Sequence, residues 1–433
     1  MKQKNLRFAW VSLVLNFLSK YFSTKIIIKA FVGAFLLANF IFLAPFNNSL
    51  FDLMSPFLTL AGIYTVITST RAGFFAAGFF SGILWFYWIS FSFIYYDLGW
   101  LIPIVILSIA TIYGFIFWAA SFPSFITLRA VVLFIFSYIH PFGFNWFNLE
   151  ATLVLGAFDP SARGLAFMFL AAISLAYFSK IYKFIAVFIC LVCALQFDSK
   201  DVKILPFELQ LTNSDILQRQ RWDKELKNSF INENLAVIDD AINNGKRAIL
   251  MPESAFPTFI THESNLQTEL KEKSQQIAII AGGLAYENKQ IYNSAFFFDK
   301  GEMKRFDKLI LVPFGEEIPL PNFIKEIINK MFFDGAQDFQ TAKTLSDYEI
   351  DGVKIRNAIC YEATRDELYE GKFDVMFAIT NNGWFKARYF PSTEPILQRN
   401  LLKYYATKYN KTIYHSVNGS PSEIITPKKS LFN

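Results

Sequence analysis

Residues 26–46 are Ile-Ile-Ile-Lys-Ala-Phe-Val-Gly-Ala-Phe-Leu-Leu-Ala-Asn-Phe-Ile-Phe-Leu-Ala-Pro-Phe, with a single charged side chain, Lys29. A helix that crosses the hydrocarbon core of a bilayer needs about 20 predominantly apolar residues. Lys29 lies one turn from the start of the run, so its long side chain can extend to the membrane surface. The stretch therefore predicts a membrane-spanning helix.

Six further apolar runs follow before residue 198, the last two of them short: Leu50–Ser69, Gly73–Tyr95, Trp100–Phe122, Ala130–Phe147, Gly164–Phe178 and Tyr182–Phe197. Together the runs predict an α-helical membrane bundle of about seven spans. Another apolar stretch, Phe8–Leu18, is followed by no small-residue cleavage site, so we expect an uncleaved interfacial helix there. The long connection Phe142–Arg163, with Trp146 and Phe147, is also expected at the membrane interface.

Charge divides the chain into two parts. Residues 1–200 hold 12 Lys and Arg against 5 Asp and Glu, whereas the remainder holds 29 against 31. Only 18% of all residues are charged and 53% are hydrophobic, whereas about a quarter of a soluble domain is charged. The small net positive charge belongs to the membrane part, so it does not indicate the clustered basic face of a nucleic-acid-binding domain.

The charges between the runs predict the orientation of the bundle. One set of connections is basic and contains no acid: Lys2, Lys4, Arg7, Lys20, Lys25, Arg71, Arg129, Lys180 and Lys183. The alternate set is mainly acidic: Asp52, Asp97, Glu150, Asp159 and Asp198, against Arg163 and Lys200. Basic loops stay in the cytoplasm, so the N-terminus is expected inside. We expect a transmembrane bundle at residues 1–198 and an extracytoplasmic domain at 199–433.

After residue 202 the pattern changes to short β-rich runs that alternate with amphipathic helices. The expected strands are Ile204–Leu211, Arg247–Leu250, Ile277–Ala281, Ser294–Phe298, Leu309–Val312, Val353–Ala358, Val375–Thr380 and Thr412–Val417. The expected helices are Asp223–Asn244, Glu263–Ser274 and Pro391–Tyr409. This alternation favours an α/β or layered α+β sandwich.

Polar clusters follow several of these strands, at the edge where open α/β sheets place their sites. Three cysteines occur in the chain. Cys190 and Cys193 lie within an apolar run and are expected to be packing residues rather than a redox or metal pair. Cys360 ends a strand and opens a predicted helix, Tyr361–Tyr369, whose positive end would stabilise a thiolate.

A nucleophilic cysteine needs a base and a group that stabilises the developing oxyanion. Glu253 and Lys308, each at the end of a predicted strand, are the candidates. The spacing alone leaves a second interpretation open, because a Glu–Lys pair is often only a salt bridge. The three histidines, His140, His262 and His415, are scattered, so no metal site is expected.

Four motifs carry a resemblance to a known family: Pro-Glu253-Ser-Ala-Phe-Pro, Lys308…Leu-Val-Pro-Phe-Gly-Glu316, Ile-Cys360-Tyr-Glu362 and Asn-Asn-Gly-Trp384-Phe. They are similar to those of the carbon–nitrogen hydrolase (nitrilase) superfamily. Preceded by a membrane bundle, they resemble the apolipoprotein N-acyltransferase family within it. The resemblance covers essentially the whole chain and implies an αββα sandwich for its second part.

The resemblance also implies roles for individual residues. Glu253 resembles the general base, Lys308 the cation that holds the oxyanion, and Cys360 the nucleophile that becomes an acyl thioester. Further residues resemble supporting positions: Glu316 (with Glu317 as the alternative), Tyr361, Glu362, Trp222 near the site entrance, and Trp384, for which packing is an equal alternative.

The activity that the resemblance implies is acyl transfer from a phospholipid to the N-terminal amine of diacylglyceryl-cysteine lipoproteins. It implies no cofactor, and a bacterial inner membrane with the catalytic domain on the periplasmic side. One alternative is a membrane-tethered amidase or hydrolase that uses water as the acceptor. Another is a transporter or receptor with a silent outer domain, which an intact Glu253, Lys308 and Cys360 disfavour.

The part of the chain after Cys360 and the apolar segment Phe323–Phe333 each allow more than one interpretation. No apolar run after Cys360 is long enough to form the closing span that is usual in the family, and the region around His415 looks divergent. A paralogue with a different acceptor preference is therefore a further alternative. The apolar segment Phe323–Phe333 is interpreted either as an arm that enters the lipid or as ordinary helix core.

Overall fold

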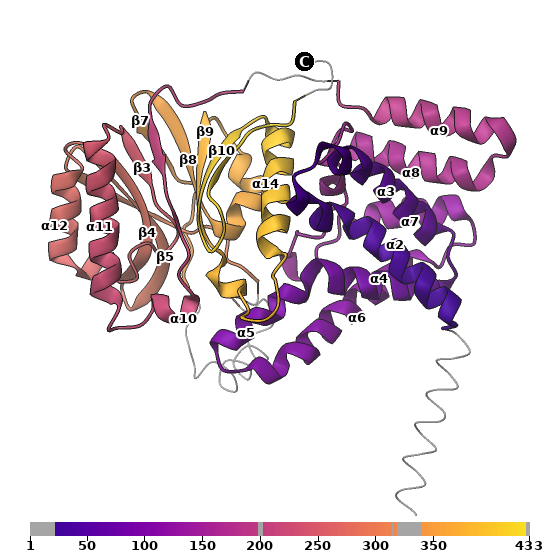
Figure 1. Ribbon diagram of the computed structural model, residues 1–433, viewed down its shortest axis with the longest axis horizontal. Coiled ribbons are helices and arrows are strands. Elements are labelled where there is room, and N and C mark those ends of the chain that lie inside the picture. Colours follow the sequence, from indigo (N-terminus) through magenta and orange to yellow (C-terminus); the bar gives the residue numbers. More distant parts are fainter. Residues whose placement is uncertain (1–21, 198–201, 314, 318–338, 430–433) are drawn as a thin grey trace, which may run out of the picture.

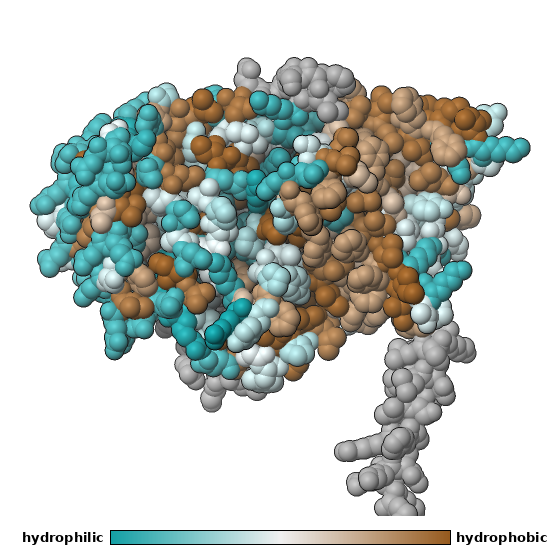
Figure 2. All heavy atoms as spheres, in the orientation of Figure 1, coloured by the Kyte–Doolittle hydropathy of each residue, from teal (hydrophilic) through white to brown (hydrophobic). Residues whose placement is uncertain are grey.

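The computed structural model describes residues 22–197, 202–313, 315–317 and 339–429. Apolar helices form one half of the molecule, and two β-sheets with flanking helices form the other (Figure 1). Figure 2 shows hydrophobic residues over the helical half and hydrophilic residues over the far side of the sheet-containing half. The predicted interfacial helix Phe8–Leu18 and the segment Phe323–Phe333 lie outside the described residues.

Within the described residues, four helical segments are long and apolar enough to cross a bilayer: Thr24–Phe46, Ser49–Ile67, Arg71–Tyr95 and Gly99–Ala120. The helices of this half are α2 (Thr24–Leu43), α3 (Ser49–Ile67), α4 (Arg71–Phe86), α5 (Ser92–Tyr95), α6 (Ile102–Ala120), α7 (Ile126–Phe136), α8 (Ala162–Tyr177) and α9 (Lys180–Ala194). At 1.5 Å per residue, α7, α8 and α9 are each shorter than a bilayer core of about 30 Å. Seven spans therefore remain a prediction.

Helices α4 and α6 pack closely because of two glycines, Gly78 and Gly82, one turn apart on α4. A Cβ atom at Gly78 would lie 2.3 Å from the carbonyl oxygen of Tyr113, and one at Gly82 would lie 2.9 Å from the Cα of Ala110. Small residues at this spacing let the backbones of membrane helices approach each other. The pair therefore fixes the contact between α4 and α6.

The connection between α7 and α8 packs between the two halves of the molecule. Helix α7 ends at Phe136, so the run Ala130–Phe147 is not one helix. Trp146 and Phe147 are each 3% exposed and belong to the hydrophobic core that joins the two halves. The connection is therefore a docking loop, and we use this name for residues 140–156.

The second half contains two sheets. The first has the strand order β1-β3-β4-β5-β6, and the second has the order β11-β10-β9-β8-β7, with β2 also paired to β10. The strands are β1 (Leu209–Leu211), β2 (Asn213–Ser214), β3 (Ala248–Leu250), β4 (Ala278–Glu287), β5 (Gln290–Asp299), β6 (Glu302–Asp307), β7 (Asp347–Ile350), β8 (Val353–Ile359), β9 (Val375–Asn381), β10 (Thr412–Asn418) and β11 (Glu423–Ile425).

The two sheets pack face to face through a core that includes Leu250, Ile280, Ile355 and Ile379. Helices α11 (Lys227–Asn243) and α12 (Ser264–Lys273) cover the outer face of the first sheet. Helix α14 (Glu394–Tyr409) covers the second sheet and lies between it and the membrane helices (Figure 1). These layers form the αββα sandwich that the resemblance implied.

A single hydrophobic core extends from α14 into the membrane bundle, and it includes Leu397 and Leu401 of α14 together with Trp85 and Leu165. A buried amide adds a polar contact, because Asn400 Nδ2 donates to the carbonyl oxygen of Phe40 at 3.1 Å. The sandwich is therefore packed onto the bundle rather than tethered to it by the chain alone.

The segment after β11 also returns to the bundle. The ammonium group of Lys428 donates to the carbonyl oxygens of Leu153 and Phe158, at 2.9 and 2.6 Å, and Gln196 Nε2 donates to the carbonyl oxygen of Lys428. Burial lowers the pKa of Lys428 to about 7. This segment attaches the β11 edge of the second sheet to the helical half.

Two predicted elements are wrong. Leu309–Val312 is not a strand, because side chains capture the N–H groups that a strand would pair: Glu362 accepts from Leu309 and Ile310, and Glu316 accepts from Val312. The predicted helix Tyr361–Tyr369 is instead two short 3-10 turns, η7 (Cys360–Thr364) and η8 (Asp366–Tyr369).

Candidate active site

The candidate triad lies where three strands end. Glu253 follows β3, Lys308 follows β6 and Cys360 follows β8. Strand β3 runs parallel to β4, and two successive antiparallel pairings then give β6 the same direction, so Glu253 and Lys308 leave the first sheet at one edge. The Cys360 thiol lies close enough for the charges of Glu253 and Lys308 to act on its pKa.

Lys308 is completely buried and forms an ion pair with Glu316, with 2.6 Å between Nζ and Oε2. Burial by itself lowers the pKa of Lys308, but the carboxylates of Glu316 and Glu253 outweigh it and raise the pKa above its usual value. The lysine therefore keeps its positive charge inside the protein, which is the charge needed beside a developing oxyanion.

Asn293, on β5, connects the two carboxylates around this lysine. Its Nδ2 donates to Glu253 Oε1 at 2.7 Å and to Glu316 Oε1 at 2.9 Å. One amide thus orients both acids toward the single cation, Lys308. Glu316 therefore lies beside Lys308 and Glu253 in the fold.

Glu253 is held against the first sheet by a close backbone approach. A Cβ atom at Gly282 of β4 would lie 2.6 Å from the Cα of Glu253, so only glycine leaves room for this turn. Burial raises the pKa of Glu253, against the lowering effect of the Lys308 ammonium. A carboxyl whose pKa is raised toward neutrality is suited to accept and return a proton.

Cys360 has a left-handed backbone conformation, with φ of 57°. This conformation is unfavourable for a residue with a Cβ, and it persists only where surrounding contacts enforce it. Burial and the neighbouring Glu253 raise the pKa of the Cys360 thiol well above its usual value. This direction of shift favours the protonated thiol over a thiolate stabilised by a helix end, and a thiol needs a proton acceptor before it can attack.

Glu362 supports the turn from the side of the sandwich. Its carboxylate accepts backbone hydrogen bonds from Ile359 at 2.7 Å, Leu309 at 2.8 Å and Ile310 at 3.1 Å. Burial raises its pKa to about 7, although these donors and Lys308 oppose the increase. Glu362 thus joins the segment after Lys308 to the turn that begins at Cys360.

The three aromatic candidates lie in different packing environments. Tyr361 is buried and faces the membrane half, where its ring stacks on Phe144 with centroids 5.7 Å apart. Trp384 packs against Tyr95 of α5, with ring centroids 4.9 Å apart, which favours the packing interpretation. Trp222 is partly buried and caps α10 (Gln218–Arg221).

Sequence reasoning missed three polar residues in this region: Asn293, Arg221 and Glu394. Arg221 is 1% exposed, donates to the carbonyl oxygen of Ser254, and carries a positive charge that acts on Glu253. Glu394 is fully buried at the start of α14, near enough to Glu253 and Cys360 for their charges to interact. Of the three, only Asn293 had a signal in the sequence, because it is a polar residue next to an apolar predicted strand.

We expect Glu394 to be protonated in the folded protein, because burial and Glu253 raise its pKa well above the usual value. Above pH 4.5 the folded state then binds a proton that the unfolded state releases, so stability falls as pH rises, by up to about 1.4 kcal/mol per pH unit. Glu394→Gln removes this dependence. The difference in unfolding midpoint between the variant and the wild type should therefore increase from pH 5 to pH 8 in detergent. An equal difference at every pH would show that Glu394 is ionised in the fold.

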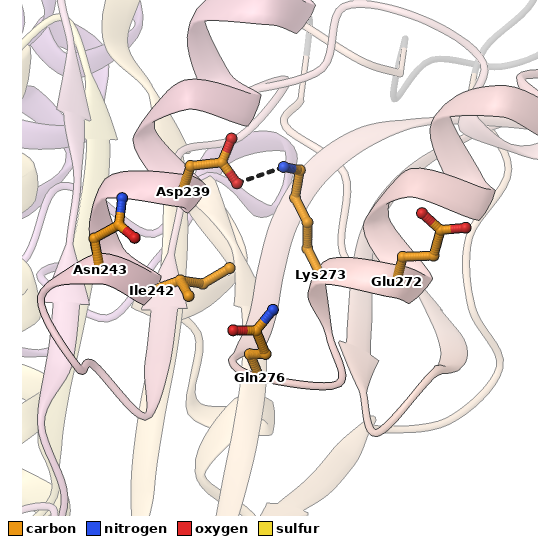
Figure 3. A pocket seen from close by; sticks show the side chains of 6 residues that line it. All are labelled: Asp239, Ile242, Asn243, Glu272, Lys273 and Gln276. Carbon is orange, nitrogen blue, oxygen red and sulfur yellow. Dashed lines mark hydrogen bonds and ion pairs between the residues drawn. The ribbon is translucent and has the colours of Figure 1, made fainter.

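A groove between α11 and α12 lies on the opposite side of the sandwich from α14. It is lined by Asp239, Ile242, Asn243, Glu272, Lys273 and Gln276 (Figure 3). Lys273 pairs with Asp239 across it, so its charge is already balanced. The groove contains none of the candidate residues.

Comparisons with known proteins agree with the motifs over nearly the whole chain. A family model described as the apolipoprotein N-acyltransferase integral membrane domain matches residues 23–197. The apolipoprotein N-acyltransferase of Wolinella succinogenes is 41% identical over 92% of this chain and 95% of its own length. The corresponding protein of Campylobacter jejuni is 39% identical over 94% of this chain and 90% of its own length.

Among solved structures, a CN-hydrolase superfamily protein from Xanthomonas campestris matches 51% of this chain and 82% of its own, with 11% identity and a TM-score of 0.39. Membership rests instead on the sequence identity to the curated relatives, which extends through both halves of the molecule. The chain belongs to the apolipoprotein N-acyltransferase family.

Proposed function

We propose that this protein transfers an acyl chain from a phospholipid to the N-terminal amine of a diacylated lipoprotein, through a thioester on Cys360. The observation that carries the proposal is the cluster of two buried residues, Glu253 and Lys308, with the partly buried Cys360, beside an apolar helical bundle. A lipid-solvated bundle delivers substrates that are themselves in the membrane, and such proximity lowers the barrier by several kcal/mol.

In the first step Glu253 takes the proton of the Cys360 thiol, and the sulfur attacks the carbonyl carbon of the phospholipid ester. Lys308 stabilises the oxyanion that forms. When the C–O bond breaks, Glu253 returns the proton to the departing oxygen. The products of this step are a lysophospholipid and an acyl thioester on Cys360.

In the second step the amine of the acceptor attacks the thioester carbon and gives a proton to Glu253. The C–S bond breaks, the amide is released, and the sulfur regains the proton as a thiol. An amide is more stable than a thioester, so the sequence proceeds toward product. Burial of the cluster supports this outcome, because it restricts the access of water as a competing acceptor.

The same proposal includes the orientation. A cytoplasmic N-terminus and seven crossings would place the domain from residue 199 onward outside the cytoplasm, on the periplasmic side of a bacterial inner membrane. The support is the absence of acids from one set of connections in the sequence. In this arrangement α7, α8 and α9, although short, each cross or enter the bilayer.

A trapped intermediate tests the proposal. The purified protein, incubated in detergent with a phospholipid carrying a labelled acyl chain, should acquire a label that hydroxylamine removes and that Cys360→Ala lacks. Addition of a diacylated lipopeptide should then move the label into a triacylated product. An unlabelled wild-type protein would contradict acyl transfer, and release of labelled free fatty acid despite the lipopeptide would indicate a hydrolase.

A further inference from the structure

The turn that begins at Cys360 is held from two sides. Glu362 fixes it to the sandwich through three backbone N–H groups. The residues on the other side of the turn, Tyr361, Thr364 and Arg365, all contact the docking loop of the membrane half. The left-handed backbone at Cys360 therefore lies between two anchors that come from different halves of the molecule.

The contacts on the membrane side are specific. Asn145 Nδ2 donates to the carbonyl oxygen of Thr364 at 2.7 Å, and Trp146 Nε1 donates to Thr364 Oγ1 at 2.8 Å. The carbonyl oxygen of Gly143 accepts from Arg365 at 2.7 Å and from the Tyr361 hydroxyl at 3.1 Å. Phe144 of the docking loop also stacks on Tyr361. Residues 143–146 of the loop thus contact Tyr361 and Thr364 of η7 and its cap residue Arg365.

The contacts of Asn145 and Trp146 with Thr364 are buried, so they are not a loose surface association. Asn145 is 7% exposed, Trp146 is 3% exposed, and Thr364 is completely buried. Asn145 Nδ2 also donates to the Tyr405 hydroxyl of α14 at 2.9 Å, which fixes the orientation of its amide. If the turn moved away, the Asn145 amide and the carbonyl oxygen of Thr364 would both be buried without their hydrogen bond. Relaxation of the turn therefore costs free energy.

We propose that Asn145 and Trp146 are positioning residues for the Cys360 nucleophile, so that the membrane bundle forms part of the catalytic apparatus. This inference deepens the proposed function and rests on it for the role of Cys360. The physical argument is that an unfavourable backbone conformation persists only when contacts on both sides enforce it. Removing the anchor on the membrane side lets η7 relax and moves the sulfur away from Glu253 and Lys308.

The test uses a matched pair of substitutions in the full-length protein. Asn145→Ala removes the amide that holds the turn, whereas Asn400→Ala removes a second buried amide between the same two halves, which contacts Phe40 and not the turn. Both are made with Cys190→Ala and Cys193→Ala, so that Cys360 is the remaining cysteine. Trp146→Phe, which keeps most of the ring, is the milder second variant.

The first measurement is the rate of alkylation of Cys360 by iodoacetamide between pH 6 and pH 9, because it requires no substrate. Since a displacement of about 1 Å can cost roughly 10²-fold, we expect Asn145→Ala to change this rate by at least about ten-fold and to shift its pH profile. Trp146→Phe should change the rate in the same direction. Asn400→Ala should leave it within about two-fold of the rate of the protein that carries only Cys190→Ala and Cys193→Ala.

The second measurement is acyl transfer, in which Asn145→Ala should lower kcat while KM stays within about two-fold. Equal effects of Asn145→Ala and Asn400→Ala on alkylation would overturn the inference, because both would then act through general stability. No effect of either Asn145→Ala or Trp146→Phe on alkylation would overturn it as well. If alkylation changes as expected but no variant or wild type transfers an acyl chain, the proposed function fails while the positioning role stands.

Discussion

Replacing Lys308 by methionine is expected to lower the rate of thioester formation by about 10²–10³-fold, because the oxyanion loses its preorganised cation. The same change should destabilise the fold by about 3–5 kcal/mol, since it leaves Glu316 and Glu253 buried without the opposite charge. Acyl labelling from the phospholipid measures the first effect, and denaturant unfolding in detergent measures the second.

The loss of stability in Lys308→Met should depend on pH in a defined direction. Without the cation that lowers it, the folded-state pKa of Glu253 rises further, so the variant binds a proton on folding and becomes less stable as pH increases. The destabilisation relative to wild type should therefore be smaller at pH 5 than at pH 8.

The matched control is Lys273→Met, which removes a lysine that pairs with Asp239 in the outer groove. It should cost less than about 1 kcal/mol and leave labelling intact. If Lys308→Met labels as fast as the wild type, the lysine does not stabilise the oxyanion.

Replacing Glu253 by glutamine should slow acyl transfer by about 10²–10⁴-fold, which is the range for loss of a general base. Because the pKa of Glu253 is raised, the activity of the wild type should fall as pH decreases through a value above the usual 4.5. This acidic limb of kcat/KM should be absent in Glu253→Gln, since the amide does not titrate. Glutamine can still accept the hydrogen bond from Asn293, so the cluster keeps its shape.

Glu394→Gln is the control for this pH profile, because it replaces a second buried carboxyl near the same sulfur. The kcat/KM profile of Glu394→Gln should retain its acidic limb. If the acidic limb is instead absent in Glu394→Gln and present in Glu253→Gln, the general base is Glu394.

The sequence predicted the central strands of the sandwich, such as β3, β4, β8, β9 and β10, because each is a short β-rich run, but it predicted no strand for β2, β6, β7 or β11. Glu253 and Cys360 follow β3 and β8, which were predicted, whereas Lys308 follows β6, a strand that the sequence did not predict. Family resemblance supplied their roles, which spacing alone left undecided between a reactive cluster and a salt bridge.

The wrong and missing predictions involve contacts between residues that are distant in the chain. The run Leu309–Val312 has the composition of a strand, but its first two N–H groups bond to Glu362, more than 50 residues later. The run Ala130–Phe147 has the composition of one span, but α7 ends at Phe136, and Trp146 and Phe147 are buried in the core that joins the two halves. Arg221 and Glu394 had no recognisable motif, and only the folded chain brings them toward Glu253.

The continuous core between the bundle and α14 has a consequence for biosynthesis. The helices from α2 to α9 leave the ribosome before any strand of the sandwich, so the surface that contains Trp85 and Leu165 exists before α14 is made. The inserted bundle then acts as a template on which the last third of the chain completes its fold. A product truncated before α14 leaves that apolar surface uncovered, which is the kind of exposed patch that membrane quality-control proteases recognise.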